Sequence, residues 1–323
     1  MKIKKNKIYI IAEIGMNHGG NIPLAKRLIK DAKKAGADAA KFQIFEPHTL
    51  GREKNKNVAN NRYIKLFTSD SDIKKLKKCC ESNKIDFICS IFDIPSLERI
   101  KKFNLKFIKI ASSELNNLEL LRKIKKTNTP TILSTGMSSN HEIKKAIKIL
   151  KNPILLHCVS LYPCSPSKIN LNRMKKLKEK YNLTTGFSDH SIGVNACKIS
   201  IAKGARVIEK HFTHNQKIKG SDHIHSSDKK ELSDLVNFAK NYENYLGSGK
   251  IDPSSEELKI QRLARKGLYF SKDFNKGHLV SKKDIVLLRP ENGLNINDLK
   301  KFVGKKLITK VTRFQNLNKK LLK

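Results

Sequence analysis

Residues 184–212 read TTGFSDHSIGVNACKISIAKGARVIEKHF, a stretch in which two apolar segments flank one helical segment. TTGFSDH (184–190) and ARVIEKHF (205–212) are short, β-rich runs of the kind that form strands. The residues between them have a helical pattern, and Gly204 stands where that helix is expected to end. A strand, a helix and a second strand in this order predict a parallel β-α-β unit.

The same unit recurs along most of the chain. The eight apolar runs begin at Ile8, Ala37, Asp86, Lys106, Pro130, Pro153, Thr184 and Ala205. Amphipathic segments separate these runs, and Pro23 stands at a first helical turn, where proline is tolerated. Eight alternating units in roughly 240 residues match an α/β protein with a (β/α)8 TIM barrel, whose usual size is about 250 residues. A doubly wound open sheet is the second choice, because no GxGxxG fingerprint follows the first strand.

The alternation stops after Gly247-Ser248-Gly249. The remaining sequence contains short strand-like pieces, glycine-containing turns and one short helical candidate near 297–302. We therefore expect a barrel over 1–250, a linker over 251–261 and a small β-rich domain over 262–323. A domain of about sixty residues is only marginally stable alone, so we expect it to lean on the barrel or on a partner subunit.

The strong positive charge does not indicate a nucleic-acid-binding protein. The 323 residues are 38% hydrophobic, enough for a buried core, and 67 Lys+Arg against 29 Asp+Glu give a net charge of +38. Lysine outnumbers arginine 56 to 11 and is spread over nearly every expected helix. A nucleic-acid surface more often concentrates arginine and aromatic residues on one element. We expect no specific nucleic-acid partner, although the diffuse charge would draw anionic small substrates towards a cleft.

Neither a membrane segment nor a disulfide framework is expected. The chain has no run of 18 apolar residues, the length that a membrane-spanning helix requires. The start, MKIKKNKIYIIAEIG (1–15), contains Glu13 and lacks a small-residue cleavage site, so it predicts a strand rather than a signal peptide. The 6 cysteines show neither CxxC pairs nor regular spacing and are expected to be reduced. These features predict a cytoplasmic protein.

Polar side chains gather towards the carboxyl ends of the expected strands, the face on which barrel enzymes build their active sites. They are Glu13, Lys41, Gln43, Lys109, Ser112, Glu114, Ser134, His157, Ser188, His190, Glu209 and His211. One such residue alone would indicate only a strand end, whereas a set over seven strands is difficult to dismiss. Buried lysine and glutamate are costly unless they are paired or used in chemistry. The pattern predicts an active-site mouth.

Two histidines end consecutive strands and are predicted to bind a metal ion. His190 and His211 would lie within reach of one divalent cation and leave coordination positions open for water and substrate. His214, His223 and His225 are weaker candidates, because loop histidines are commonly just solvated.

A second group predicts an anion-binding site in the same mouth. Two ammonium groups and three hydroxyls would hold a phosphate and a carboxylate together: Lys41, Lys109, Ser112, Ser134 and Ser188. Glu13, Glu114 and Asp222 are carboxylates suited to hydroxyl recognition or proton transfer. Cys158 has no adjacent base in the sequence and is interpreted as a core residue.

At these residues the sequence closely resembles the sialic acid synthases, the bacterial nonulosonate synthase family. The shared motifs are IAEIGMNHGG (11–20), GADAAKFQIF (36–45), FIKIASSELNN (107–117), ILSTGMSS (132–139), LLHCVSLYP (155–163), GFSDHSIG (186–193) and VIEKHFT (207–213). The tail beginning RKGLYFSKDFNKG (265–277) resembles the family's antifreeze-like (SAF) domain. The resemblance implies an enzyme that condenses phosphoenolpyruvate with an N-acetylated hexosamine, usually N-acetylmannosamine, and releases phosphate.

The resemblance also implies roles for individual residues. His190 and His211 would hold Mn²⁺ or Mg²⁺, Glu13 would lie near the reacting carbons, and the two lysines and three serines of the anion site would bind phosphoenolpyruvate. The sugar would be contacted by Gln43, Glu114, Ser160, Tyr162 and Asp222. Arg289 would reach the sugar's acetamido group from the partner subunit of a domain-swapped homodimer.

Two departures from the family pattern bear on the sugar. Ser160 stands where acetylneuraminate synthases often carry Asn, and Glu291 replaces a glycine of the family's RPGxG motif, next to Arg289. A legionaminate or pseudaminate synthase that uses a diacetamido-dideoxy hexose is therefore the alternative. A non-catalytic protein that binds polyanions or carbohydrates is a remote alternative, which the inward carboxylates and the histidine pair disfavour.

Overall fold

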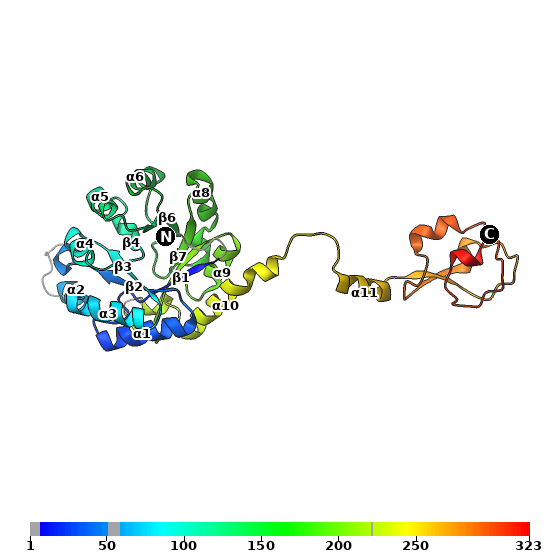
Figure 1. Ribbon diagram of the computed structural model, residues 1–323, viewed down its shortest axis with the longest axis horizontal. Helices are drawn as coiled ribbons and strands as arrows, with labels where there is room; N and C mark the ends of the chain where they lie inside the picture. The colour runs from blue at the N-terminus through cyan, green and yellow to red at the C-terminus, as the bar shows by residue number, and fades with distance from the viewer. Residues whose placement is uncertain (1–6, 51–58, 221) are drawn as a thin grey trace. The chain divides into compact units, whose positions relative to one another are not determined.

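The computed structural model describes residues 7–50, 59–220 and 222–323 (Figure 1). The chain divides into two compact units, Met1–Tyr245 and Leu246–Lys323. The expected linker, 251–261, overlaps a short helix of the second unit. Among the described helices, none combines the length and the hydropathy that a membrane crossing requires.

The first unit is a closed barrel in which eight strands follow one another in sequence order. The strands are β1 Tyr9–Glu13, β2 Ala39–Ile44, β3 Asp86–Ile91, β4 Ile108–Ile110, β5 Thr131–Ser134, β6 Ile154–Cys158, β7 Thr185–Asp189 and β8 Val207–His211. Each strand pairs in parallel with the next, and β8 closes the barrel against β1. The prediction of a TIM barrel is confirmed, and the open-sheet alternative is wrong.

Helices surround the strands on the outside of the barrel (Figure 1). They are α1 Ile22–Ala35, α2 Ala59–Leu66, α3 Asp70–Ser82, α4 Ile94–Ile100, α5 Leu118–Lys126, α6 Asn140–Leu150, α7 Pro166–Ile169, α8 Asn172–Tyr181, α9 Asn195–Ala202 and α10 Lys229–Leu246. Local sequence signals mark their ends. The Asn21 side chain caps α1, Pro23 lies in its first turn, and Gly36 ends it in the left-handed region with a φ of 94°.

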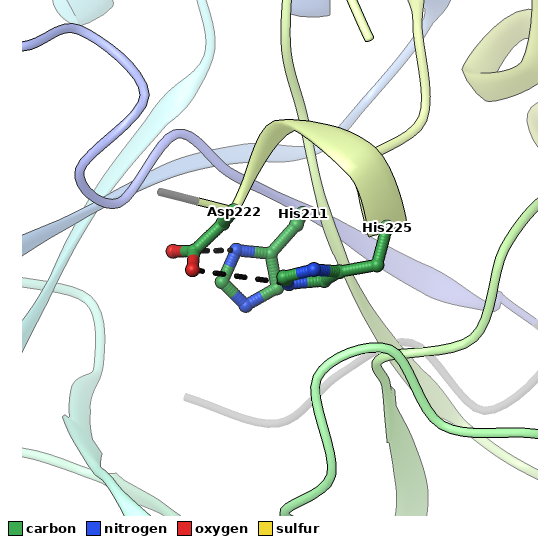
Figure 2. Close-up of side chains that lie close together, drawn as sticks. All are labelled: His211, Asp222 and His225. Atoms are coloured by element: carbon green, nitrogen blue, oxygen red, sulfur yellow. Dashed lines mark ion pairs between the residues drawn. The ribbon is translucent and has the colours of Figure 1, made fainter. Parts of the chain in front are cut away.

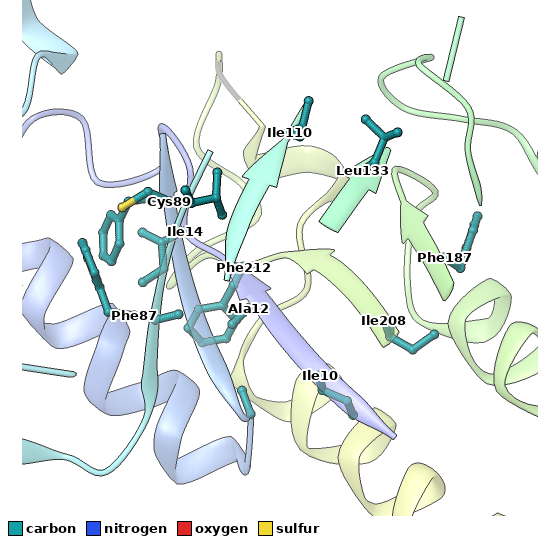
Figure 3. Packing of buried hydrophobic residues seen from close by; sticks show 14 of the residues in the cluster. Ile10, Ala12, Ile14, Phe87, Cys89, Ile110, Leu133, Phe187, Ile208 and Phe212 are labelled. Atoms are coloured by element: carbon teal, nitrogen blue, oxygen red, sulfur yellow. The ribbon is translucent and has the colours of Figure 1, made fainter. Parts of the chain in front are cut away.

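The core between strands and helices follows from the period of two along each strand. In β1 and the residue after it, Ile10, Ala12 and Ile14 point outwards and join the apolar cluster of the helix layer (Figure 3). Phe187 of β7 and Ile208 of β8 belong to the same layer. The outward-facing residues are mostly apolar because they are buried between two layers of structure.

The inward-facing residues change character along the barrel axis. Tyr9, Ile11, Ala39, Ile88, Phe107, Ile132, Leu156 and Val207 form a separate apolar cluster inside the barrel. Two residues further along their strands, Glu13, Lys41, Lys109 and Glu209 are also buried, but they are charged. The barrel is thus closed by an apolar plug on one side, and a polar layer begins where the strands end.

Close packing inside the barrel requires glycine at one position of β7. A Cβ atom on Gly186 would lie 2.1 Å from the carbonyl oxygen of Val207 and 2.8 Å from Leu156 Cδ2. The glycine of the GFSDH motif therefore lets β7 approach β8 closely. This approach sets the spacing of the two strands that carry His190 and His211.

The second unit has a small apolar core of its own. It contains α11 Ser255–Ala264 and two antiparallel strands, β9 Gly267–Phe270 and β10 Ile285–Leu288. It also contains short 3₁₀ helices, and η6 Ile296–Lys301 lies where a short helix was expected. The core residues of this unit include Phe270, Phe274 and Val311.

Candidate active site

The ends of β1 and β2 bring three predicted site residues into contact. The register places Glu13 opposite Lys41. Lys41 Nζ lies 2.9 Å from Glu13 Oε2 and donates a hydrogen bond of 2.8 Å to Ser90 Oγ. Gln43 Nε2 donates to Glu13 Oε1 at 2.9 Å. The Glu13 carboxylate is therefore held on both oxygens and is 1% exposed.

A second buried group joins β4, β5, β7 and β8. Lys109 Nζ donates to Ser134 Oγ at 2.7 Å, and Ser188 Oγ donates to Glu209 Oε1 at 2.9 Å. Glu209 lies 3.7 Å from the ammonium groups of both Lys109 and Lys41. Glu209 thus links the two lysines into one charge cluster of Glu13, Lys41, Lys109 and Glu209, which we call the charged layer.

The charged layer perturbs the pKa values of its members in opposite directions. Burial and the charge of Glu209 raise the pKa of Glu13, although Lys41 opposes this change. Burial would also raise the pKa of Glu209, but the two lysines outweigh it and hold that pKa below its usual value. Burial lowers the pKa of Lys109, whereas the carboxylates around Lys41 outweigh burial and raise its pKa. Two buried carboxylates whose pKa values are shifted in opposite directions are typical of sites that transfer protons.

Two further serines meet at the loop after β5. The Gly136 amide donates to Ser112 Oγ at 3.0 Å. A Cβ atom on Gly136 would lie 2.5 Å from Ser160 Oγ and 2.8 Å from Ser112 Oγ, so the two hydroxyls border the same glycine. Cys158 lies beside them, and burial raises the pKa of its thiol. This places Cys158 inside the barrel as a buried residue, as expected.

The predicted histidine pair lies together at the mouth of the barrel. The ring centroids of His190 and His211 are 5.3 Å apart, and Tyr162 lies 4.0 Å from the His190 ring. His190 Nδ1 is 2.9 Å from the carbonyl oxygen of Val159, so this nitrogen carries the proton and Nε2 is left as a lone-pair donor. Burial lowers the pKa of both histidines, which keeps the imidazoles neutral, as a metal ligand requires.

His211 also belongs to a cluster with Asp222 and His225, and each of the three offers one ligand atom within 4.8 Å of the others. Asp222 Oδ2 lies 3.4 Å from His211 Nδ1, and Asp222 Oδ1 lies 3.9 Å from His225 Nε2 (Figure 2). The 3₁₀ helix η4, His223–His225, carries His225 back over the end of β8. Two imidazoles and one carboxylate form a donor set typical of divalent first-row metals.

Hydrogen bonds fix the loop that carries this cluster. Ser226 Oγ donates to the carbonyl oxygen of Asp222 at 2.6 Å. Asn17 Nδ2 donates to Ser226 Oγ at 2.8 Å and to the carbonyl oxygen of Phe212 at 3.0 Å. Asn17 of the IAEIGMNHGG motif therefore ties the loop after β1 to the loop that positions Asp222 and His225.

A buried ion pair holds the turn that carries His190. Lys210 Nζ lies 2.9 Å from Asp189 Oδ2, and both side chains are fully buried. Lys210 also donates to the carbonyl oxygen of Ser191, and the Ser191 amide donates to Asp189 Oδ1 at 2.8 Å. The residues on both sides of His190 are thus fixed from the outer face of the barrel.

Not every predicted residue takes part in these contacts. Glu114 lies in the 3₁₀ helix η3, Ser112–Glu114, is half-buried, and accepts a hydrogen bond from Asn117 Nδ2 at 3.1 Å. Arg289 directly follows β10 in the second unit and is exposed. Within that unit, Tyr269 Oη donates to the carbonyl oxygen of Pro290 at 2.7 Å, and the Glu291 amide donates to that of Arg262. The altered RPENG turn is therefore well supported by its own unit.

The structure adds Ser90 to the predicted site, and it gives specific contacts to Glu209, expected only as one of the polar strand-end residues, and to His225, expected only as a weaker metal candidate. Ser90 lies on β3 and accepts the hydrogen bond from Lys41. Glu209 links the two lysines, and its place on β8, two residues before His211, is the sequence signal for a shared inward face. His225 follows a loop of irregular sequence, and no sequence pattern predicts that this loop returns to the end of β8.

A closed (β/α)8 barrel with buried charges and clustered histidines at the carboxyl ends of its strands defines the class of this protein: it is a TIM-barrel enzyme. Residues 28–251 of the chain match the sequence model of the NeuB family. An N,N'-diacetyllegionaminic acid synthase from Legionella pneumophila is 36% identical over 323 aligned positions, which cover 93% of this chain and 90% of the relative. A pseudaminic acid synthase from Campylobacter jejuni is 37% identical, covering 93% of this chain and 92% of the relative.

A solved structure agrees with these relatives. The N-acetylneuraminic acid (sialic acid) synthetase from Leptospira borgpetersenii is similar with a TM-score of 0.74 and 35% identity, covering 80% of this chain and 94% of that chain. The chain belongs to the NeuB family, so it is an enzyme of the nonulosonic acid synthase type and the expected resemblance is confirmed. Synthases of this family are metal-dependent, in agreement with the histidine cluster.

Proposed function

We propose that this enzyme condenses phosphoenolpyruvate with an open-chain acetamido hexose and water, giving a nine-carbon nonulosonic acid and phosphate. The observation that carries this proposal is the charged layer beside the histidine cluster, at the carboxyl ends of the strands. Two buried ammonium groups suit the phosphate and carboxylate of one small anion. The adjacent imidazoles suit a divalent cation beside a sugar aldehyde.

The identity of the sugar is the open part of this proposal. The relatives include synthases of diacetyllegionaminic and pseudaminic acids as well as a sialic acid synthetase. N-acetylmannosamine is our first candidate, and a diacetamido-dideoxy hexose is the alternative. Ser160 borders Gly136 at the mouth and has a shorter side chain than the Asn that acetylneuraminate synthases often carry there, which is why the alternative is kept. Gln43, Glu114, Tyr162 and Asp222 are the other proposed sugar contacts.

We assign phosphoenolpyruvate to Lys41, Lys109, Ser112, Ser134 and Ser188. Two hydrogen bonds already connect the charged layer to serines of this set: Lys109 donates to Ser134, and Ser188 donates to Glu209. Lys41 and Lys109 each lie 3.7 Å from Glu209, so the two ammonium groups are close enough to bind one small anion. Substrate orientation in a partly desolvated mouth then contributes to the rate.

The site fits a divalent cation, because His211 Nδ1 and both ring nitrogens of His225 are buried and have no hydrogen-bond partner in the described parts of the chain. We propose that His190 and His211 hold Mn²⁺ or Mg²⁺. The chemistry that such a cation supplies is polarisation of an aldehyde oxygen.

The protein's own groups would direct the bond changes. C3 of phosphoenolpyruvate forms a bond to the aldehyde carbon, whose oxygen takes up a proton and becomes a hydroxyl, and water adds to C2. The bond between C2 and the phosphate oxygen then breaks, the added hydroxyl becomes the C2 carbonyl, and its proton leaves with the phosphate. Glu13, beside Lys41 and with a raised pKa, is placed to accept the proton of that water. Lys41 and Lys109 would hold the anion in line during these steps.

The direct test is an assay of phosphate release. The full chain is incubated with phosphoenolpyruvate, Mn²⁺ and either N-acetylmannosamine or a diacetamido-dideoxy hexose, and the product is identified by mass spectrometry. Sugar-dependent phosphate release with a nine-carbon keto acid is expected for one of the two sugars. Phosphate release that does not depend on any amino sugar would contradict the proposal.

Replacement of Lys109 by methionine should weaken phosphoenolpyruvate binding selectively. Methionine keeps the apolar stem and removes the charge, and hydrogen bonds to charged groups contribute about 1.5–3 kcal/mol, which corresponds to roughly a 10- to 100-fold higher KM. The KM for the sugar should change by less than about threefold. Lys144→Met on the exposed face of α6 is the matched control. An unchanged KM for phosphoenolpyruvate would remove Lys109 from the anion site.

We further propose that the second unit is an SAF-type domain whose Arg289 completes the site of a partner subunit in a cytoplasmic homodimer. This proposal rests on the resemblance and on the planar, permanently charged guanidinium, which suits an acetamido carbonyl. Mixing inactive His190→Ala with inactive Arg289→Ala should restore part of the activity, because each mixed dimer would have one intact site. Mixed dimers that form without any recovery would show that Arg289 does not act across subunits.

A further inference from the structure

His225 is a buried imidazole that the proposed reaction leaves without a role. It is 1% exposed, and among the residues that the structure describes neither of its ring nitrogens has a hydrogen-bond partner. A buried polar group without a partner is unfavourable for folding. A neutral imidazole has one N–H group and one lone pair, and each needs a partner when the ring is buried. A bound group is therefore expected beside this ring.

The surroundings of His225 indicate what that group is. Its ring centroid lies 4.8 Å from that of His211 and 6.0 Å from that of His190. Asp222 Oδ1 lies 3.9 Å from His225 Nε2, and Figure 2 shows the carboxylate facing both imidazoles. Each of the three neutral imidazoles has one lone pair and the carboxylate adds oxygen donors, a set that suits a divalent cation.

The position of His225 is also fixed in advance. Ser226, the next residue, holds the Asp222 carbonyl and is itself held by Asn17 of the first loop. In η4, His223 Nδ1 lies 2.8 Å from Thr213 Oγ1, so the neighbouring histidine already has a protein partner. Among the described residues, His225 therefore differs from His223 in lacking a hydrogen-bond partner and from the exposed His214 in being buried.

We infer that His225 is a third imidazole ligand of the divalent cation proposed for His190 and His211, with the Asp222 carboxylate beside it. This inference rests on the metal site of the proposed function and specifies its ligand set. A set of three imidazoles suits Mn²⁺, Fe²⁺ or Zn²⁺ better than Mg²⁺, which prefers oxygen ligands. The chain should thus bind Mn²⁺ much more tightly than Mg²⁺.

Mn²⁺ binding by the EDTA-treated full chain tests the inference without any assay of activity. The signal of free Mn²⁺ in electron paramagnetic resonance gives the affinity, and pulsed measurements count the coupled histidine nitrogens. We expect three in the unmodified protein and two in His225→Gln, together with at least about a 10-fold loss of affinity. His214→Gln is the matched control and should behave as the unmodified protein.

A second variant, His225→Cys, tests the inference even if His225→Gln folds poorly, because it is expected to gain an absorption signal. In His225→Cys, a thiolate would replace the imidazole, and added Co²⁺ should give the near-ultraviolet thiolate-to-cobalt absorption that the unmodified protein lacks. Unchanged Mn²⁺ affinity and nitrogen count in folded His225→Gln, or no thiolate absorption in folded His225→Cys, would overturn the inference. Failure of the proposed function differs from this outcome, because it would appear as three coupled nitrogens without sugar-dependent phosphate release.

Discussion

Alanine in place of His211 is expected to reduce phosphate release by about a thousandfold or more, because polarisation of the aldehyde by a cation contributes several kcal/mol to the transition state. The same result is expected for His190→Ala. His190 has its Nδ1 proton directed at the Val159 carbonyl, and its other nitrogen is left for a ligand. Steady-state kinetics at saturating Mn²⁺ and both substrates would measure the loss in kcat.

The control for this prediction is His214→Ala, which removes an exposed histidine three residues after His211. Circular dichroism should show that all three variants retain the fold, since both site histidines lie at strand ends and not within the apolar layers. Full activity of either site variant after chelation and return of Mn²⁺ would remove that histidine from the metal site. Loss of activity in the control would instead point to a structural effect of the loop.

The fold was predictable because the strand pattern is local and strong. Each strand alternates between an outward apolar face and an inward face, as Ile10 and Ile11 of β1 illustrate. Polar residues such as Glu13 and Lys41 interrupt the inward face only near the strand ends. A sequence run with these features predicts a strand, and it also predicts at which end of that strand the active-site residues lie.

The contacts that complete the site were less predictable, because they depend on loops. Glu209 could be placed by its period of two from His211, yet its links to both lysines require the closed barrel. His225 lies beside His211 in a loop that has no periodic pattern and that hydrogen bonds of Asn17 and Ser226 hold in place. Sequence spacing alone places a loop histidine in solvent as readily as in a site.

Lys210→Met is expected to lower the free energy of unfolding by about 3–5 kcal/mol, the usual cost of leaving one charge of a buried pair without its partner. Lys210 and Asp189 are both fully buried and lie 2.9 Å apart on the outward faces of β8 and β7. Urea denaturation followed by circular dichroism would measure the loss. Lys198→Met is the matched control, because its pair with Asp234 is partly exposed and should contribute at most about 1 kcal/mol.

The double variant Lys210→Met/Asp189→Asn distinguishes a charge effect from a packing effect. Asparagine keeps an oxygen for the Ser191 amide and removes the buried negative charge, so the double variant should be more stable than Lys210→Met alone. If methionine merely packed badly, the second substitution would add to the loss instead.

An apolar residue is expected at an outward strand position, yet Lys210 occupies one and donates to the Ser191 carbonyl next to His190. The double variant should therefore recover stability without full recovery of phosphate release, since the turn that carries His190 has lost its anchor.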